Sequence, residues 1–407
     1  MLFFVLFLLM TLSLVGWMVY FVMTIWNYIQ MPSLSKISSK KLLTNAPLVS
    51  VIIPARNEEK RIKKCIQALK TQTYSNLEIF IVDDHSSDKT VEISRRIIGD
   101  DKRFKIISLK DVEKEKPKGW IGKSYAIQQG CKHANGDWLL FCDVDYMEYN
   151  PNLIRRGVEY VIENNIDFLS LMPSHICGSF WEKAIQPVPL GLLSMLSPIA
   201  QVNKSQSRTA IAFGCFILIS HSIFNKLGGY TKIRDRIADD VELAKLVKQS
   251  GFKIGLALGR QMLKIRMYEG FDEVWQGWNK NIFLGVIQKC QIRSKILQFL
   301  FTVVGLFCLF CVMVFPFLLL LSSIFLILFI PSVMLWRILL YSLLVWIFSI
   351  FVQSYVQKCY SICNPKYAPV VLLVGGFVTM GMFLNSAIKV LSGTGVIWKD
   401  RIYFNRT

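Results

Sequence analysis

The sequence predicts an α/β domain built on a parallel sheet and attached to membrane-spanning helices at both ends. The chain has 407 residues and a mean hydropathy of +0.41, which is too apolar for an ordinary soluble protein. Uncharged apolar segments long enough to cross a bilayer lie near both ends. Between them, short β-branched runs alternate with amphipathic helical segments, a pattern typical of parallel strands joined by right-handed helical crossovers.

The charge of the chain is strongly basic and is concentrated outside the apolar segments. Lys and Arg number 47 against 28 Asp and Glu, which gives a formal net charge of +19. Such a domain suits an anionic membrane surface and a polyanionic small molecule. Nucleic acid is the alternative partner, but the chain shows no compact Lys/Arg run or recognition module, so we expect no nucleic acid. The ten cysteines form no paired framework, and we expect scattered buried thiols in a reducing cytoplasm.

The N-terminal segment is expected to anchor the chain. Residues 2–26 carry no charge and are long enough to span a bilayer. A cleaved signal peptide is the alternative, but neither a basic first region nor a small-residue cleavage site is visible, so we interpret residues 1–30 as an uncleaved anchor. A basic linker follows at residues 31–47, with Lys36, Lys40 and Lys41. By the positive-inside tendency this linker is cytoplasmic, which leaves the N-terminus outside.

Residues 48–290 carry the alternating pattern of the α/β domain. Strands are predicted at 48–54, 77–82 and 104–109 and from Trp138. Helices are predicted to open at 56–59, with Ile62, Ile66 and Leu69 on the apolar face, and then from Thr90 and beside Lys123. A polar cluster follows each of these strands, at the edge where ligands bind in sheets of this kind.

Two carboxylates follow the fourth strand. Asp143 and Asp145 are one residue apart, and alternation along an extended chain points both side chains to the same side. Carboxylate oxygens suit a hard divalent cation, Mg²⁺ or Mn²⁺, with diphosphate oxygens and water completing its shell. A solvated acidic turn is the alternative for such a pair considered alone.

Five motifs together resemble the family 2 glycosyltransferases, whose nucleotide-sugar domain has the α/β fold called GT-A. They occur in the family's order at residues 51–59, 82–88, 122–124, 143–145 and 239–244. The segments 120–124, 266–271 and 398–403 further resemble the membrane-bound branch that acts on polyisoprenoid-type lipids, including carotenoid acids. His85 and Asp400 stand where the family usually has glycine.

The resemblance implies a nucleotide-sugar site formed by Pro54, Arg56, Glu58, Asp83, Asp84, Lys123 and Asp143. Asp83 or Asp84 would accept a hydrogen bond from the uracil ring, while Arg56 and Glu58 border the base and ribose. For Asp84, Ser86 and Ser87, an Asx turn that caps the following helix is the other interpretation, and both can hold together. Lys123, near a helix start, favours the diphosphate, although a surface lysine is the alternative.

The resemblance also implies that Asp240 is the catalytic base and that the adjacent Asp239 supports it. A carboxylate beside the acceptor removes its proton while the acceptor oxygen attacks the anomeric carbon. Capping of a helix N-terminus is the alternative role. A carboxylic acid acceptor is already ionised, so the base then matters more for positioning.

The remaining segments are apolar. Residues 180–202 are interrupted by three prolines, and we interpret them as an interfacial segment that admits a lipid, with a buried core segment as the alternative. Residues 296–390 predict three or four further membrane spans before a basic tail at 391–407. The tail prefers the cytoplasm, which requires an even number of crossings after the α/β domain.

Together these features predict a multi-pass enzyme of the cytoplasmic membrane with its catalytic domain in the cytoplasm. Its expected reaction is inverting transfer of a hexose, with glucose favoured, from a UDP-sugar to a lipid acceptor. A processive polysaccharide synthase is the alternative within the same chemistry, but the Gln-x-x-Arg-Trp segment usual in those enzymes is missing. A non-catalytic membrane scaffold is the alternative of another class, and it would have no use for Asp143, Asp145 and Asp240.

Overall fold

The computed structural model describes residues 1–36, 45–112, 117–195, 198–236, 238–284, 286–287, 292, 294–398 and 401–403. The chain forms two compact units. The α/β unit contains Gln30–Ile176 and Pro198–Met267, and the helical unit contains Met1–Ile29, Cys177–Ser197 and Tyr268–Thr407. The expected ranges 48–290 and 296–390 stay predictions. Lys40, Lys41, Lys399, Asp400 and Arg406 lie outside the described residues.

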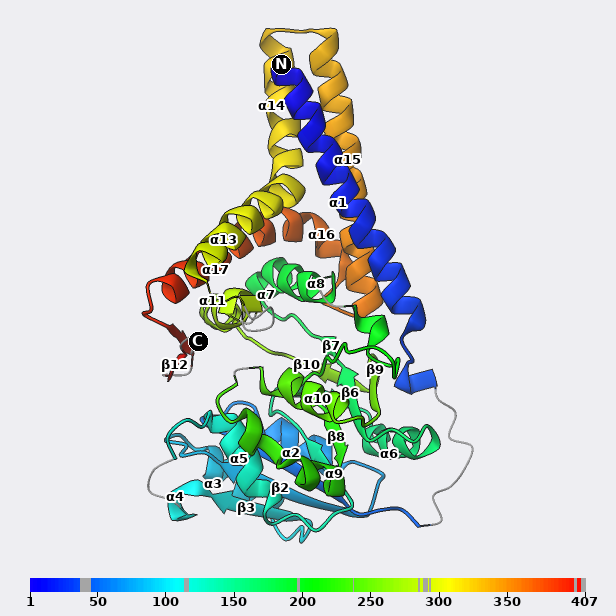
Figure 1. The fold of residues 1–407 in the computed structure, drawn as a ribbon, viewed down its shortest axis with the longest axis vertical. Helices are drawn as coiled ribbons and strands as arrows, with labels where there is room; N and C mark the ends of the chain where they lie inside the picture. The colour runs from blue at the N-terminus through cyan, green and yellow to red at the C-terminus, as the bar shows by residue number, and fades with distance from the viewer. Residues whose placement is uncertain are drawn as a thin grey trace. The chain divides into compact units, whose positions relative to one another are not determined.

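A seven-stranded sheet organises the α/β unit, in the order β3-β2-β1-β4-β8-β6-β9 (Figure 1). Its strands are β1 (Val49–Ala55), β2 (Leu77–Asp83), β3 (Phe104–Ser108), β4 (Trp138–Phe141), β6 (Phe168–Met172), β8 (Ile217–Ser220) and β9 (Ile254–Leu258). The four predicted strands are present and pair in parallel. A wholly parallel sheet is nevertheless wrong, because β8 runs antiparallel to both β4 and β6. The chain returns to the sheet at the carboxyl edge, beside the end of β6, so β8 must run away from that edge.

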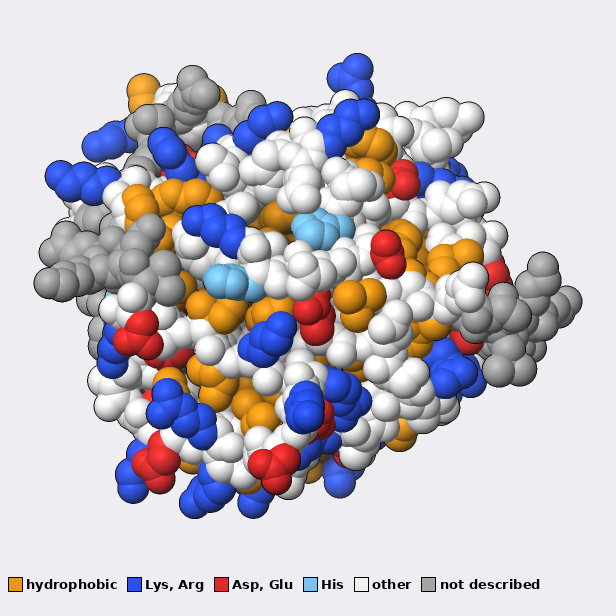
Figure 2. Space-filling view, turned by 90° about the horizontal axis from the view of Figure 1, so that it is seen from below, with side chains coloured by type: hydrophobic (Ala, Val, Ile, Leu, Met, Phe, Trp, Pro, Cys, Tyr) orange, Lys and Arg blue, Asp and Glu red, His pale blue; other side chains and the backbone are white. Residues whose placement is uncertain are grey.

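Helices pack on this sheet, and a smaller sheet of β5 (Tyr146–Tyr149), β10 (Leu263–Ile265) and β7 (Ser174–His175) stands beside it. The helices are α2 (Ile62–Lys70), α3 (Thr90–Ile98), α4 (Leu109–Val112), α5 (Gly122–Cys131), α6 (Leu153–Glu163), α9 (His221–Leu227) and α10 (Asp239–Gln249). The predicted apolar face of α2 is confirmed, since Ile62, Ile66 and Leu69 are fully buried. Figure 2 shows Lys and Arg side chains spread among acidic ones over one face of this unit.

Helix α2 begins later than predicted. Residues 56–59 are not its first turn, because Asn57 has a left-handed backbone with φ of 51°. Side chains from the β2–α3 connection satisfy the backbone N–H groups here: Ser86 accepts from Asn57, Thr90 from Glu58 and Asp88 from Glu59. Because these groups already have acceptors, the chain can form a loop at this position in place of a helical turn.

Among the described residues of the helical unit, four helices are long and apolar enough to cross a membrane, at Leu2–Gln30, Lys295–Phe329, Val333–Tyr360 and Pro365–Leu391. Its elements are α1 (Leu2–Gln30), α7 (Phe180–Ile185), α8 (Pro187–Met195), α11 (Phe271–Asn279), α13 (Lys295–Leu309), α14 (Phe315–Phe329), α15 (Val333–Tyr360), α16 (Ala368–Val370) and α17 (Gly376–Leu391). The C-terminal segment therefore provides three such helices, the lower of the two predicted numbers.

Lys295–Phe329 is one bent helix. A π-helical turn at Phe310–Val314 separates α13 from α14 and directly precedes Pro316, and both features bend helices. The chain reverses direction later, near Pro331, where the Ser332 hydroxyl accepts a hydrogen bond from the N–H of Leu335 and caps α15. Helices α14 and α15 therefore form the hairpin (Figure 1).

Helix α17 packs antiparallel to α13. Gly376 lies against Met313 and Phe383 against Gly305, while Val390 and Ile292 pack on one hydrophobic cluster near the other end. The segment from α13 to α17 therefore begins and ends at the same end of the α13–α17 pair. Helix α17 thus ends on the side where α13 begins, as it would after an even number of membrane crossings.

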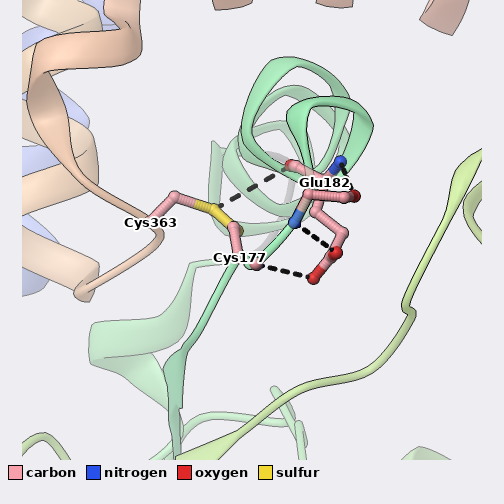
Figure 3. Close-up of a disulfide and its surroundings, with 5 residues drawn as sticks. Cys177, Glu182 and Cys363 are labelled. Atoms are coloured by element: carbon pink, nitrogen blue, oxygen red, sulfur yellow. Dashed lines mark hydrogen bonds between the residues drawn. A yellow bond between two sulfur atoms is a disulfide. The ribbon is translucent and has the colours of Figure 1, made fainter.

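A disulfide joins Cys177, just before α7, to Cys363, after α15, with a Cα–Cα distance of 5.3 Å (Figure 3). The prediction of unpaired thiols is therefore wrong for these two residues, since their 186-residue separation gives no sequence signal. Seven other described cysteines are free. Beside the bond, Ser179 and Glu182 form a capping box that starts α7. Residues 180–195 form the two short helices α7 and α8.

Candidate functional site

The first acidic cluster comprises Glu58, Glu59, Asp83, Asp84 and Asp88, which follow β1 and β2. Strand register places Pro54 beside Val82 and brings the two connections together. Asp83 and Asp84 are almost fully buried, at 2% and 4% exposed. The sheet thus brings together the residues predicted to contact the nucleotide base.

Hydrogen bonds within the chain occupy much of this cluster. Oδ1 of Asp83 accepts from the N–H of Ser86 at 3.2 Å, which stabilises the turn after β2 without capping α3. Nη1 of Arg56 donates to the backbone oxygen of Asp84 at 3.2 Å. His85 has φ of 61°, the left-handed conformation that glycine adopts without strain, and so keeps the turn where the family has glycine.

Asp88 has a role that the sequence did not predict. It accepts from the N–H of Glu59 and from both the N–H and the hydroxyl of Thr90, at 3.0, 3.0 and 2.5 Å. Burial works to raise the pKa of Asp88, but these hydrogen bonds outweigh it and hold the pKa below its ordinary value. Asp88 therefore ties the two connections together and starts α3.

The second acidic cluster comprises Asp143, Asp239 and Asp240 with the ammonium group of Lys123. Nζ of Lys123, in the first turn of α5, lies 2.7 Å from Oδ1 of Asp143, in the connection after β4. Burial opposes the charged form of Lys123, but Asp143, Asp239 and Asp240 together raise its pKa well above the ordinary value. The structure thus brings together four residues that the sequence predicted to act together.

Asp239 and Asp240 are the first residues of α10, so their predicted alternative as helix-start acids also holds. Oδ2 of Asp240 accepts from the N–H of Gly214 at 2.9 Å, and Oδ1 accepts from the N–H of Val241 at 2.8 Å. Burial and the neighbouring Asp239 raise the pKa of Asp240 to about 6, while Lys123 works to lower it. A carboxylate with this pKa can accept a proton near neutral pH.

Asp143 and Asp145 contact different cations. Strand β4 ends at Phe141, so the two aspartates lie in a loop and the alternation argument of an extended strand does not apply. Oδ1 of Asp145 lies 3.9 Å from Nη1 of Arg61, a residue that the sequence did not single out. Arg61 also lies 3.7 Å from Glu58, which links the first acidic cluster to Asp145.

The donor set at Asp143 and Asp145 fits a hard divalent cation. Both side chains are partly exposed, at 26% and 31%, and offer carboxylate oxygens. Among the described residues, no three or more His, Cys, Asp or Glu gather as a ready-made metal site. A cation here would therefore need oxygens from a bound ligand, as a diphosphate supplies.

The structure also assigns two residues that sequence motifs left open. Trp120 packs edge-to-face on Tyr125 at 5.5 Å between ring centroids, so packing is one role of this side chain. Gly214 lies among Lys123, Asp143 and Asp240. Only the fold shows that this glycine touches the second acidic cluster.

Comparison with known proteins gives consistent matches. Residues 50–228 match the family model described as glycosyl transferase family 2. A 4,4'-diaponeurosporenoate glycosyltransferase of Staphylococcus haemolyticus is 28% identical over 239 residues, which cover 58% of this chain and 61% of that protein. The protein of that name in Staphylococcus aureus strain USA300 is 25% identical over 269 residues, covering 65% and 69%. The match therefore spans less than two thirds of the S. haemolyticus protein.

A solved structure has a similar fold over most of its length. The mannosyltransferase PcManGT from Pyrobaculum calidifontis, solved with GDP-Man and Mn²⁺, superposes with a TM-score of 0.53 and 16% identity, covering 94% of this chain and 98% of that one. The α/β unit therefore has the predicted GT-A fold, and fold and family match together define a transferase class of enzyme. Over residues 50–228 the chain is therefore similar to the family 2 glycosyltransferases.

Proposed function

We propose that this chain is a membrane-anchored, inverting hexosyltransferase that moves a sugar, with glucose favoured, from a UDP-sugar to a lipid acceptor. The observation that carries the proposal is the convergence of Lys123, Asp143 and Asp240 on Gly214, because it joins a diphosphate-binding cation, a metal-binding carboxylate and a base. The names of the staphylococcal relatives support a carotenoid-type acceptor.

The first acidic cluster would hold the nucleotide. Asp83 or Asp84 accepts from the uracil ring, while Pro54, Arg56 and Glu58 border the base and ribose. The ammonium group of Lys123 faces the diphosphate and opposes its charge, and proximity of these groups fixes the orientation of the sugar.

Asp143 and Asp145 would hold a divalent cation, Mg²⁺ or Mn²⁺, together with the diphosphate oxygens, and the Mn²⁺ in the PcManGT structure supports this. When bound, the cation neutralises charge on the departing diphosphate. Nothing in the described donor set prefers one of these two ions.

Transfer proceeds by attack of an acceptor oxygen on the anomeric carbon. The new carbon–oxygen bond forms on the face opposite the diphosphate while the bond to the diphosphate breaks, and UDP leaves with the electron pair. Asp240 takes the proton of a hydroxyl acceptor, with Asp239 supporting it. A carboxylate acceptor has no proton to give, so Asp240 then serves to position it.

The arrangement of the helical unit supports a multi-pass protein of the cytoplasmic membrane with its catalytic site in the cytoplasm. Helices α1, α14 and α15 would cross the bilayer, and α13 with α17 would begin and end on the cytoplasmic side. Disulfides are rare in a reducing cytoplasm. The disulfide between Cys177 and Cys363 therefore argues against this assignment, and treatment of growing cells with a permeant maleimide tests it, because free thiols at both positions would support a cytoplasmic site. A disulfide found in growing cells would contradict the cytoplasmic assignment.

The main test uses membranes that contain the full chain, radiolabelled UDP-glucose and Mn²⁺ or Mg²⁺, with a long-chain carotenoid acid supplied as acceptor. We expect label in one discrete lipid, and loss of that product in Asp240→Asn. Asp235→Asn is the matched control, because Asp235 lies in the same segment with a 46% exposed side chain paired to Arg236.

Other outcomes would point to other functions. Label in an insoluble polymer would favour a polysaccharide synthase. No transfer from any common nucleotide sugar, despite supplied lipids, would favour a non-catalytic scaffold and contradict the proposal.

A further inference from the structure

The turn at residues 213–216 holds the carboxylate of Asp240 from outside its own helix. Gly214 donates its N–H to Oδ2 of Asp240 at 2.9 Å, and Val241 donates to Oδ1 at 2.8 Å. Both oxygens of Asp240 are therefore fixed by backbone N–H groups that come from two different elements. The turn, and not α10 alone, determines where this carboxylate points.

The neighbouring side chains leave no room for a Cβ atom at Gly214. Its backbone does not lie in the left-handed region, so the conformation itself does not require glycine. A Cβ built at Gly214 would lie 2.7 Å from Nζ of Lys123, 3.3 Å from Oδ2 of Asp143 and 3.5 Å from Oδ2 of Asp240. A methyl group here would therefore displace the ammonium group from its place beside Asp143.

Ser170 fixes the position of this turn. Its hydroxyl accepts from the N–H of Phe213 at 2.8 Å and donates to the carbonyl of the same residue at 3.3 Å. Ser170 is fully buried in β6, whose five residues are all buried. A hydroxyl at such a position needs partners, and both of its hydrogen bonds go to the residue next to Gly214.

We propose that Ser170 and Gly214 are positioning residues of the transferase site. Ser170 anchors Phe213, Phe213 places Gly214, and Gly214 orients the carboxylate of Asp240 while leaving room for the ammonium group of Lys123. Neither residue takes part in bond making. The inference rests on the proposed function for the role of Asp240, and it adds a serine that no motif marks.

The first test compares Ser170→Ala with Ser50→Ala in the full chain. Ser50 is a matched control, because it is fully buried in β1 and its hydroxyl donates to Glu78 at 2.6 Å and accepts from the N–H of Gly136 at 2.8 Å. Both variants should lower the thermal midpoint by a few degrees. Only Ser170→Ala should lower kcat, by about 10-fold, with the Kd for UDP in Mn²⁺ unchanged. Equal kcat in the two folded variants would overturn the role of Ser170.

The second test uses Gly214→Ala and a readout that needs no activity. Displacement of Lys123 from Asp143 should speed acetylation of its amine by acetic anhydride about 5-fold, measured by mass spectrometry, because the ion pair of 2.7 Å that shields the amine from the reagent is lost. Gly255→Ala is the control, since the atoms nearest to a Cβ there belong to the aliphatic side chains of Ile166 and Leu169. Wild-type labelling of Lys123 in Gly214→Ala would overturn the role of Gly214.

The two readouts separate the inference from the proposed function. If wild-type protein transfers no sugar, the proposed function fails, while the labelling of Lys123 still decides whether Gly214 reserves its place. If transfer occurs and Gly214→Ala labels and reacts like wild type, the function stands and the positioning inference fails.

Discussion

Two groups of carboxylates lie at the carboxyl edge of the same sheet, and their surroundings differ. In the first acidic cluster, Asp83 and Asp88 accept hydrogen bonds from neighbouring backbone N–H groups. In the second, Asp143, Asp239 and Asp240 all act on the ammonium group of Lys123 and raise its pKa. The pKa of Asp88 is lowered, whereas burial and Asp239 raise the pKa of Asp240.

The two clusters differ in whether the surroundings of the carboxylate stabilise or destabilise its ionised form. A carboxylate that accepts several N–H groups is stabilised as an anion and keeps loops in place. A carboxylate crowded by other acids is destabilised as an anion, so it attracts cations and protons. The same residue type at the same sheet edge therefore has a lowered pKa at Asp88 and a raised pKa at Asp240.

Removal of a metal-binding carboxylate should have the largest effect. Asp143→Asn takes away a cation ligand and the partner of Lys123, so we expect a loss of about 1,000-fold in kcat/KM. EDTA should abolish transfer by the wild-type protein, and added Mn²⁺ or Mg²⁺ should restore it. The contrast between the two acidic clusters would be wrong if Asp88→Asn, in the first cluster, lost as much activity as Asp143→Asn.

Removal of the shared cation should have the next largest effect. Lys123→Met leaves three carboxylates without their common ammonium group, and we expect the Kd for UDP, measured by calorimetry with Mn²⁺, to rise about 10- to 100-fold. Lys70→Met is a suitable control, because that lysine donates to the backbone oxygens of Ile97 and Ile98, at the end of α3 away from the first acidic cluster. Unchanged UDP affinity in Lys123→Met would show that the ammonium group does not face the diphosphate.

The stability that Asp240→Asn gains over the wild-type protein should increase with pH, because the ionised Asp240 carboxylate destabilises the native state. The folded pKa of about 6 lies above the ordinary 3.8, so folding takes up a proton between these values and the anion destabilises the native state at pH 7. Asp240→Asn should therefore raise the thermal midpoint by a few degrees at pH 7 and by almost nothing near pH 4. A lower midpoint at pH 7 would mean that the Asp240 carboxylate is stabilising.

The smallest effect on activity belongs to Asp88. Asp88→Ala removes the acceptor for Glu59 and Thr90, which should cost about 1 kcal/mol at pH 7 while kcat changes less than about 2-fold. Because the folded pKa of Asp88 is lowered, its contribution is present above the unfolded pKa and is lost as the pH falls below about 4. Chemical denaturation at pH 7 and pH 3 measures this difference, and an equal loss at both would contradict the assignment.

Local pattern in the sequence identified the elements and most of the site. Strands and helices follow from side-chain periodicity, and Asp143, Asp145, Asp239 and Asp240 follow from motifs at element ends. The same reasoning failed for the start of α2. There the decisive hydrogen bonds come from Ser86, Thr90 and Asp88, about 30 residues away.

By itself, the sequence determined the fold class, the apolar spans and the residue types needed for the chemistry, because these depend on composition and short-range periodicity. Only the tertiary structure decided the direction of β8, the pairing of Cys177 with Cys363 and the contacts of Gly214. It also showed that Ser170, an unremarkable serine in an apolar strand, anchors the turn beside Asp240. These features join residues far apart in the chain, and their distances are set by how sheets and helices pack rather than by any repeat in the sequence.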